Sequence, residues 1–152
     1  RLVLWSRDES LIKDDASVLS PIDSYKVAYA NPRLAPYGKA ALEVMEALSL
    51  FESLKRNLVQ GENISQVYQF VFTGNAELGF VAQSQIPHNS ELVLGSTWVI
   101  PAALHSPIKQ DVVLLSRAKD NVAAREFMSF LSSPRSQAVI RSYGYESGVS
   151  AR

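Results

Sequence analysis

Apolar runs alternate with segments of helical periodicity along the chain. Runs rich in branched and aromatic residues predict buried strands, at residues 2–5, 25–30, 57–59, 77–82, 91–94 and 112–115. Apolar positions spaced three or four residues apart predict helices, at residues 36–48 and 50–55, after Asn63, after Asn121 and at residues 134–140. Strands that alternate with helices in this way predict an α/β protein with a mainly parallel sheet flanked by helices.

Two predicted helix starts have the features of anion sites. Pro36 opens the helix that follows the strand at residues 25–30, and Asn63 is the N-cap of the helix that follows the strand at residues 57–59. Ligands of α/β sheets collect at the carboxyl ends of the strands, where backbone N–H groups and the helix dipole attract anions. Gly38 permits a close approach of a ligand to the backbone. Two ordinary capped helices are the alternative that the spacing leaves open.

Composition narrows the classes of function. A length of 152 residues fits one domain or two small lobes. Fifteen Lys and Arg balance fifteen Asp and Glu, which argues against binding to nucleic acid. The sequence has no cysteine, so it has no thiol nucleophile, thiolate metal site or iron–sulfur cluster. No apolar run approaches the roughly 20 residues of a membrane span.

Catalytic templates are missing from the sequence. It has no glycine-rich nucleotide loop, no serine elbow and no HExxH zinc motif. His88 and His105 lie far apart in proline-containing loops, and Glu43 and Glu46 lie on the predicted exposed side of their helix. We interpret all of them as surface residues. We therefore expect no enzyme activity, no catalytic residue and no metal ion held by side chains.

Several motifs occur in a fixed order and together resemble one family. They are ANP, APYGKAA, ENISQV, TGNAELGFV, FMSFLSSP and YGY, at residues 30–32, 35–41, 62–67, 73–81, 127–134 and 143–145. In combination they resemble the periplasmic molybdate-binding proteins of molybdate ABC importers, which are type II periplasmic binding proteins. The resemblance covers essentially the whole chain.

The resemblance implies two α/β lobes joined by two crossing strands, with an oxyanion in the cleft between the lobes. Residues 1–6 then form the first crossing strand, and residues 7–104 form the second lobe. Residues 105–152 supply the return strand, near residues 112–115, and the C-terminal helices of the first lobe. The family's first strands and helices have no counterpart here. Because the sequence also starts, at Arg1, directly in an apolar run, we expect the chain to be the C-terminal part of such a protein.

The resemblance places the oxyanion ligands at the two helix starts. Tyr37 and Ile64 donate backbone N–H groups to the oxyanion, although Tyr37 also fits a helix-surface aromatic. The helix-start residues that support these two are Pro36, Gly38, Asn63 and Ser65. Some members add a tyrosine hydroxyl at the position of Ala82, which has no side-chain donor. Packing or hinge roles are expected for four further aromatic residues, Trp5, Trp98, Tyr143 and Tyr145.

The resemblance implies a periplasmic solute-binding protein that delivers molybdate, and also tungstate, to the membrane permease of an ABC importer. It implies no cofactor and no nucleic-acid partner, and the sequence does not separate molybdate from tungstate or sulfate. The alternative is the effector-binding domain of a transcription regulator with the same fold, which requires a helix-turn-helix upstream. Without a first lobe to cover them, apolar residues are expected to drive dimerisation, among them Leu2, Leu4, Val113, Leu115, Phe127 and Leu131.

Overall fold

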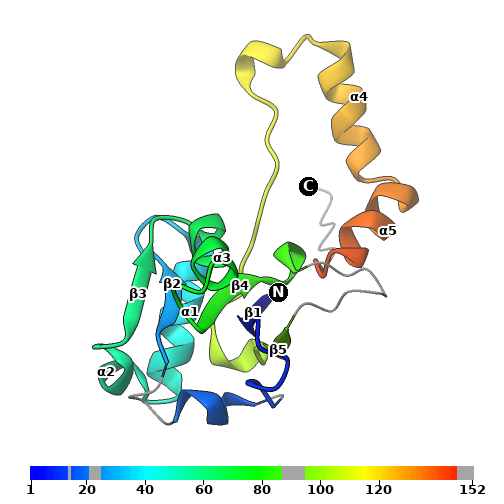
Figure 1. Cartoon of the computed structure of the whole chain (residues 1–152). Helices are drawn as coiled ribbons and strands as arrows, with labels where there is room; N and C mark the ends of the chain where they lie inside the picture. The colour runs from blue at the N-terminus through cyan, green and yellow to red at the C-terminus, as the bar shows by residue number, and fades with distance from the viewer. Residues whose placement is uncertain (14, 21–24, 87–94, 147–152) are drawn as a thin grey trace. The chain divides into compact units, whose positions relative to one another are not determined.

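The computed structural model describes residues 1–13, 15–20, 25–86 and 95–146 of the chain. The chain divides into two compact units, Arg1–Ile108 and Lys109–Arg152. The first unit contains a five-stranded sheet with helices packed against it, and the second unit contains helices (Figure 1). The predicted α/β class is therefore confirmed.

The sheet of the first unit is mixed. Its strands are β1 (Leu2–Ser6), β2 (Val27–Ala30), β3 (Leu58–Gly61), β4 (Leu78–Ala82) and β5 (Ser96–Val99), in the order β3-β2-β4-β1-β5. β2 pairs in parallel with β3 and β4. β1 runs antiparallel to both β4 and β5. The sheet is thus mixed rather than mainly parallel, with the expected parallel pairs around β2 and antiparallel pairs around β1, which lies in the interior of the sheet.

The helices of the first unit connect the parallel strands. Helix α1 (Pro36–Ala47) follows β2, the short helix α2 (Phe51–Leu54) leads into β3, and helix α3 (Ile64–Phe72) joins β3 to β4. Single turns of 3-10 helix lie at Ala16–Leu19, Gln83–Gln85 and Ala102–Leu104. The bounds of α1 and α3 agree with the predicted helix starts at Pro36 and after Asn63.

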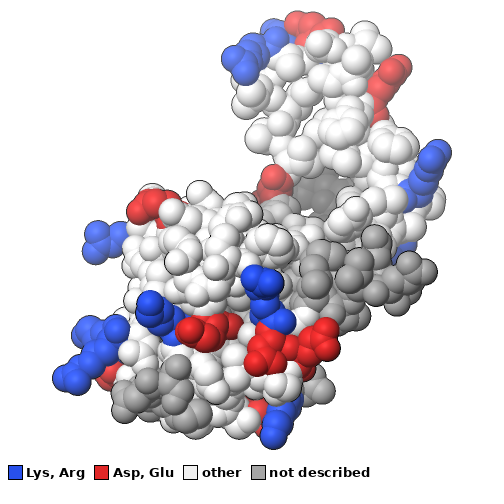
Figure 2. All heavy atoms as spheres, in the orientation of Figure 1, with Lys and Arg blue, Asp and Glu red and all other residues white. Residues whose placement is uncertain are grey.

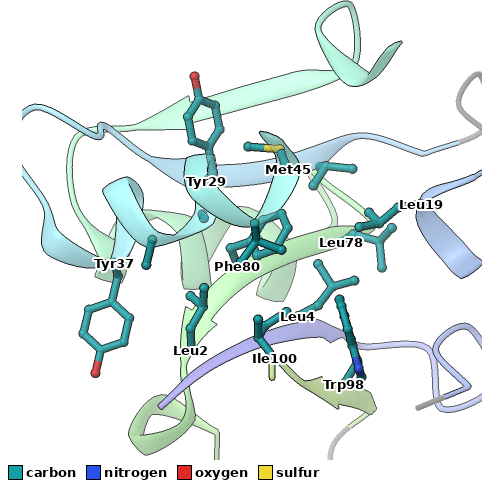
Figure 3. Packing of buried hydrophobic residues seen from close by; sticks show 14 of the residues in the cluster. Leu2, Leu4, Leu19, Tyr29, Tyr37, Met45, Leu78, Phe80, Trp98 and Ile100 are labelled. Atoms are coloured by element: carbon teal, nitrogen blue, oxygen red, sulfur yellow. The ribbon is translucent and has the colours of Figure 1, made fainter. Parts of the chain in front are cut away.

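Each face of the sheet buries its own apolar cluster, because side chains alternate between the faces of a strand. On one face, Leu4 and Phe80 of the sheet pack with Met45 of α1 (Figure 3). On the other face, Trp5 packs in a cluster that includes Val67 of α3. A fully buried side chain of this kind contributes roughly 1.5–3 kcal/mol. The two helices therefore cover opposite faces of the same strands.

The sequence pattern does not predict β5, because Ser96 and Thr97 interrupt its apolar character. The backbone before it is fixed by Gly95, whose φ is +88°, and a Cβ there would lie 1.8 Å from Ser6 O. The Ser96 hydroxyl donates to Asp8 O and accepts from Ile12 N, the latter at 3.0 Å. These contacts hold β5 beside the end of β1.

The second unit contains α4 (Val122–Leu131) and α5 (Pro134–Ser142). Asn121 caps α4 by accepting from Ala124 N at 3.1 Å, which confirms its predicted role. No residue of α4 is buried. Large apolar side chains of this unit are exposed, namely Val112, Val113, Leu115, Val122, Phe127, Phe130, Val139 and Tyr143.

The buried strand predicted at residues 112–115 is wrong. This segment has no strand geometry, and Val113 is 74% exposed. An apolar run becomes a strand only where a neighbouring strand pairs with its backbone, and no strand of the described residues pairs with this segment. The strand predicted at residues 91–94 lies outside the described residues.

The charged side chains on the surface of the described residues are of both signs. Figure 2 shows Lys and Arg side chains interspersed with Asp and Glu on the visible face, in keeping with the net charge of zero. Among the described residues, no helix combines the length and the apolar content needed to cross a membrane.

Candidate functional site

The sheet topology brings the two predicted helix starts to one edge of the sheet. β2 and β3 are parallel, and their last residues, Ala30 and Gly61, are register partners. The amide of Asn31 extends this pairing by donating to Gly61 O at 2.7 Å. α1 and α3 both begin shortly after this edge. The two helix starts therefore follow neighbouring carboxyl ends of the same parallel pair of strands.

The start of α1 is built from backbone contacts. Its N-cap, Ala35, is extended and makes no side-chain cap. Pro36 has no amide hydrogen, and the amides of Gly38 and Lys39 both donate to Ala35 O, at 2.9 and 3.1 Å. The amide of Tyr37 belongs to this same first turn.

Gly38 serves the packing of α1 on β2. A Cβ at this position would lie 2.2 Å from Ala30 O and 2.9 Å from the carbonyl carbon of Asn31. The space that the glycine spares is therefore occupied by the end of β2. The close approach of a ligand predicted for Gly38 is therefore wrong, because the backbone that approaches this glycine is the end of β2.

Tyr37 is buried in the core, with 5% of its surface exposed. Its ring lies at the margin of the apolar cluster, and its hydroxyl points away from Phe80 and Leu4 (Figure 3). The alternative of a helix-surface aromatic is therefore wrong. Burial of the ring fixes the position of the Tyr37 backbone at the helix start.

The start of α3 is built from side-chain contacts. Asn63 is extended, with φ −149° and ψ 172°, and its Oδ1 accepts from Gln66 N at 3.0 Å, which confirms the predicted N-cap. Gln66 Oε1 in turn accepts from Glu62 N at 2.6 Å. Ile64, half-buried, and Ser65, exposed, are the first two residues of the helix.

Gln85 is part of this edge and was not predicted from the sequence. It follows Ala82, the last residue of β4, which reaches the same edge because β4 is parallel to β2. Gln85 Oε1 accepts from Ala82 N at 3.0 Å, and its Nε2 donates to Ile64 O at 3.3 Å. The available signal was a glutamine three residues after the end of a strand, a spacing typical of a side chain that reaches back to the backbone.

The edge offers backbone donors rather than a cluster of metal-ligating side chains. Among the described residues, no group of three or more His, Asp or Glu side chains could hold a metal ion. Two helix starts that face one edge present backbone N–H groups and the positive ends of two dipoles. Such an arrangement favours a small anion.

Glu43 is not the fully solvated charge that the sequence suggested. It accepts hydrogen bonds from the backbone N and the hydroxyl of Ser106, at 2.6 and 3.2 Å, and pairs with Lys39 at 3.7 Å. The hydrogen bond from the Ser106 backbone is the main cause that lowers the pKa of Glu43. The carboxylate therefore ties residues 105–106 to α1, away from the helix start.

The remaining expectations concern four aromatic residues and the two histidines, and their outcomes differ. Trp5 and Trp98 are buried in the two clusters, as their predicted packing role requires. Tyr143 is 55% exposed, so it does not pack in a core of the described residues, and a hinge role stays a prediction for it. Tyr145 is half-buried. His105 is half-buried with Nδ1 2.8 Å from Ser106 O, and His88 lies outside the described residues.

Comparison with known families assigns the chain. The family of bacterial extracellular solute-binding proteins matches residues 1–146. The chain belongs to this family. Its sheet and helices accordingly form part of a solute-binding fold.

Two relatives within the family are similar in sequence over nearly the whole chain. The molybdate-binding proteins ModA of Azotobacter vinelandii and Rhodobacter capsulatus are each 46% identical over 145 residues, or 95% of this chain. The chain spans 58% and 56% of the lengths of these relatives. It therefore matches somewhat more than half of a relative of this kind.

Solved structures give the same result. The Azotobacter vinelandii periplasmic molybdate-binding protein superposes with a TM-score of 0.90 and 33% identity, covering 97% of this chain and 64% of that one. The substrate-binding domain of a putative molybdenum ABC transporter from Clostridium difficile gives 0.69 and 31%, covering 95% of this chain and 62% of that one. Both likenesses extend through the second unit of the chain.

Proposed function

We propose that this chain carries part of the binding site of a molybdate-binding protein, with the oxyanion held at the starts of α1 and α3. The observation that carries the proposal is the 46% identity to two molybdate-binding proteins over 95% of the chain. The two helix starts at one sheet edge support it, because they offer donors to an anion without requiring a charged side chain.

In this proposal the backbone N–H groups of Tyr37 and Ile64 are the ligands. Molybdate is a fully deprotonated dianion at neutral pH and accepts hydrogen bonds only. Phosphate retains a proton in much of its population and needs an acceptor as well. A site made of N–H donors leaves that proton unpaired, at a cost of about 1–3 kcal/mol. The site therefore selects molybdate and tungstate over phosphate.

The contact at Tyr37 is proposed to use the backbone and not the phenol. The buried ring makes Tyr37→Ala a test of packing, so Tyr37→Phe is the better variant. It keeps the ring and the amide and removes the hydroxyl alone. We expect the Kd for molybdate to change by less than about twofold, and a loss above about tenfold would assign the contact to the hydroxyl.

We propose that the complete cleft takes further donors from the part of the two-lobe fold that lies outside the matched 58% and 56% of the relatives. We propose that residues 1–6 cross between the lobes, residues 7–104 form the second lobe, and residues 105–152 rejoin the first. A charge-assisted hydrogen bond contributes ~1.5–3 kcal/mol. Without even three first-lobe donors, the chain alone binds molybdate at least about a thousandfold more weakly than a protein with both lobes.

The wider role follows from the family. We propose a periplasmic binding protein that is not an enzyme and that delivers its oxyanion to the permease of an ABC importer. Its relatives named above are molybdate-binding proteins. None of the proteins named above is a transcription regulator, so no observation favours that alternative.

The exposed apolar residues of the second unit support a proposal of self-association. The expectation that Leu2 and Leu4 need such cover is wrong, because both are fully buried in the sheet. Phe127 and Phe130 are 57% and 50% exposed on α4, where a first lobe would cover them. We expect the chain alone to dimerise or exchange strands through such surfaces. Light scattering that shows a strict monomer at high concentration contradicts this part of the proposal.

The experiment that tests the proposed function is calorimetric titration of a protein with both lobes, using molybdate, tungstate, sulfate and phosphate. We expect tight binding of molybdate and tungstate and rejection of phosphate. Equal affinity for phosphate and molybdate would overturn the proposed chemistry of the site.

A further inference from the structure

The side chain of Gln85 connects the end of β4 to the first residue of α3. Its Oε1 accepts from Ala82 N at 3.0 Å, and its Nε2 donates to Ile64 O at 3.3 Å. Both partners are backbone groups, one a donor only and the other an acceptor only. The two ends of the Gln85 amide are therefore assigned by their partners, and the opposite orientation would oppose like groups.

The carbonyl that Gln85 contacts belongs to the peptide group between Ile64 and Ser65. In a trans peptide the C=O and the N–H point in opposite directions. The geometry of α3 already directs Ile64 O along the helix, and the hydrogen bond from Gln85 further restrains the direction of the Ser65 N–H. It polarises the peptide as well, which strengthens that N–H as a donor.

The other side chains at this helix start act on different amides. Asn63 Oδ1 accepts from the amide of Gln66, and Gln66 Oε1 accepts from the amide of Glu62. These two caps bracket the Ile64–Ser65 peptide without contacting its carbonyl. Gln85 holds this peptide from outside the helix.

We propose that Gln85 is a positioning residue of the oxyanion site. It fixes the Ile64–Ser65 peptide so that the Ser65 N–H joins the Ile64 N–H as a second donor at the start of α3. This inference rests on the proposed function of the helix starts and adds to it both a second donor and the residue that directs it.

Two substitutions separate the hydrogen bonds of Gln85 from its volume. Gln85→Met keeps a similar length and removes both hydrogen bonds. Gln85→Glu keeps the acceptor for Ala82 N, but its ionised carboxylate turns an oxygen toward Ile64 O. Gln69→Glu is the matched control, because Gln69 is an exposed residue of α3 and receives the same change of charge.

The first measurement needs no ligand. In ¹⁵N-labelled chain, we expect the Ser65 amide proton to move upfield in both Gln85 variants, because its peptide loses the hydrogen bond on Ile64 O. The Ser65 amide of Gln69→Glu is expected to stay near its wild-type position. An unmoved Ser65 amide in both Gln85 variants overturns the claim that Gln85 holds this peptide.

The second measurement is an NMR titration of the same proteins with sodium molybdate. At pH 8 we expect the Kd to rise about tenfold for Gln85→Met and more for Gln85→Glu, and less than about threefold for Gln69→Glu. Lowering the pH to 5.5 protonates part of the introduced carboxyl, whose pKa is raised by the facing carbonyl and the dianion. The protonated form donates to Ile64 O, so the deficit of Gln85→Glu shrinks, whereas that of Gln85→Met does not.

The outcomes distinguish the two proposals. If wild-type chain and two-lobe protein both fail to bind molybdate, the proposed function falls, and the role of Gln85 with it. If the wild type binds and both Gln85 variants bind equally well, only the role of Gln85 is overturned. A deficit of Gln85→Glu that is independent of pH, beyond the change seen in wild type, shows a merely structural role and overturns the inference as well.

Discussion

The two helix starts at the sheet edge have the same place in the fold and are built by different means. At α1, the first turn depends on Pro36, an uncapped Ala35, and Gly38 pressed against the end of β2. At α3, the first turn depends on side chains, with Asn63 as N-cap and Gln85 on the Ile64 carbonyl.

This difference means that the two helix starts should respond differently to substitution. A helix start fixed by backbone packing is rigid and leaves no room for an added side-chain atom. A helix start fixed by side-chain hydrogen bonds can be loosened one bond at a time, at about 0.5–1.5 kcal/mol for each bond. Substitutions at α1 should therefore change stability first, and substitutions at α3 should change oxyanion binding first.

The largest effect is expected for Gly38→Ala. The added Cβ would lie 2.2 Å from Ala30 O, a backbone atom that cannot move without shifting β2. We expect a loss of about 3 kcal/mol or more in the free energy of unfolding, measured by urea denaturation.

Gly74→Ala is the control for this prediction. Gly74 has φ +76° and nothing within 4 Å of a built Cβ, so its substitution costs only the left-handed backbone, about 1–2 kcal/mol. An equal or smaller loss for Gly38→Ala than for Gly74→Ala would contradict the view that α1 is fixed by backbone packing.

Ile64→Pro should act mainly on binding. Asn63 is extended, with ψ 172°, which is the conformation that a residue before proline prefers. The first helical position also accepts proline. The variant should fold and lose one charge-assisted donor, with a rise of roughly 10–100-fold in the Kd for molybdate.

Ile64→Ala separates the donor from the side chain in that experiment. It shortens the apolar side chain to a methyl group but keeps the backbone N–H, so we expect the Kd for molybdate to stay within about threefold of the wild-type value. If Ile64→Ala and Ile64→Pro weaken molybdate binding equally, the side chain matters and the amide of Ile64 is not a ligand.

Smaller changes in the free energy of unfolding are expected when the side-chain cap of α3 is removed and one is added to α1. Asn63→Ala removes the hydrogen bond to Gln66 N and should cost about 1 kcal/mol. Ala35→Ser adds a hydroxyl at an extended N-cap that has no side-chain cap, and should stabilise by up to about 1 kcal/mol. Thermal unfolding measures both, and a destabilised Ala35→Ser would show that α1 has no place for a side-chain cap.

The smallest effect is expected at Glu43, which holds α1 by a side chain far from its start. Hydrogen bonds from Ser106 lower the pKa of this carboxylate in the folded chain. The stabilising contact between Glu43 and Ser106 is therefore fully present above the ordinary pKa of glutamate. It is lost as the pH falls through the lowered pKa of Glu43 in the folded chain. The Ser106 amide resonance should report this titration, and Glu43→Gln should abolish it; an unchanged titration in Glu43→Gln would assign it to another group.

Local signals predicted much of the first unit. Pro36 and Asn63 mark helix starts through chemistry that acts within one turn, and the structure confirms both. The prediction of a strand at residues 112–115 was wrong because a strand depends on a distant partner and not on local signals. The described residues supply no partner strand for Val113. β5 was missed because its polar residues are held by distant parts of the chain: Ser96 pairs with Ser6 and donates to Asp8 O, and Thr97 pairs with Trp5.

The site itself was predictable only in part. The sequence predicted that Gly38 lets a ligand approach the backbone, whereas Ala30 at the end of β2 occupies that space. It identified the helix start at Ile64, but not Gln85, whose contact with Ile64 spans 21 residues of sequence. Contacts of this kind depend on the register between β2 and β4, which a single sequence does not reveal.

The most direct test of the account is an NMR titration of the chain with sodium molybdate at millimolar concentration. We predict that the backbone amides of Tyr37 and Ile64, one from each helix start, shift most and follow a single binding curve. Shifts confined to surface Lys and Arg residues, or separate curves for the two amides, would contradict a shared oxyanion site at this edge of the sheet.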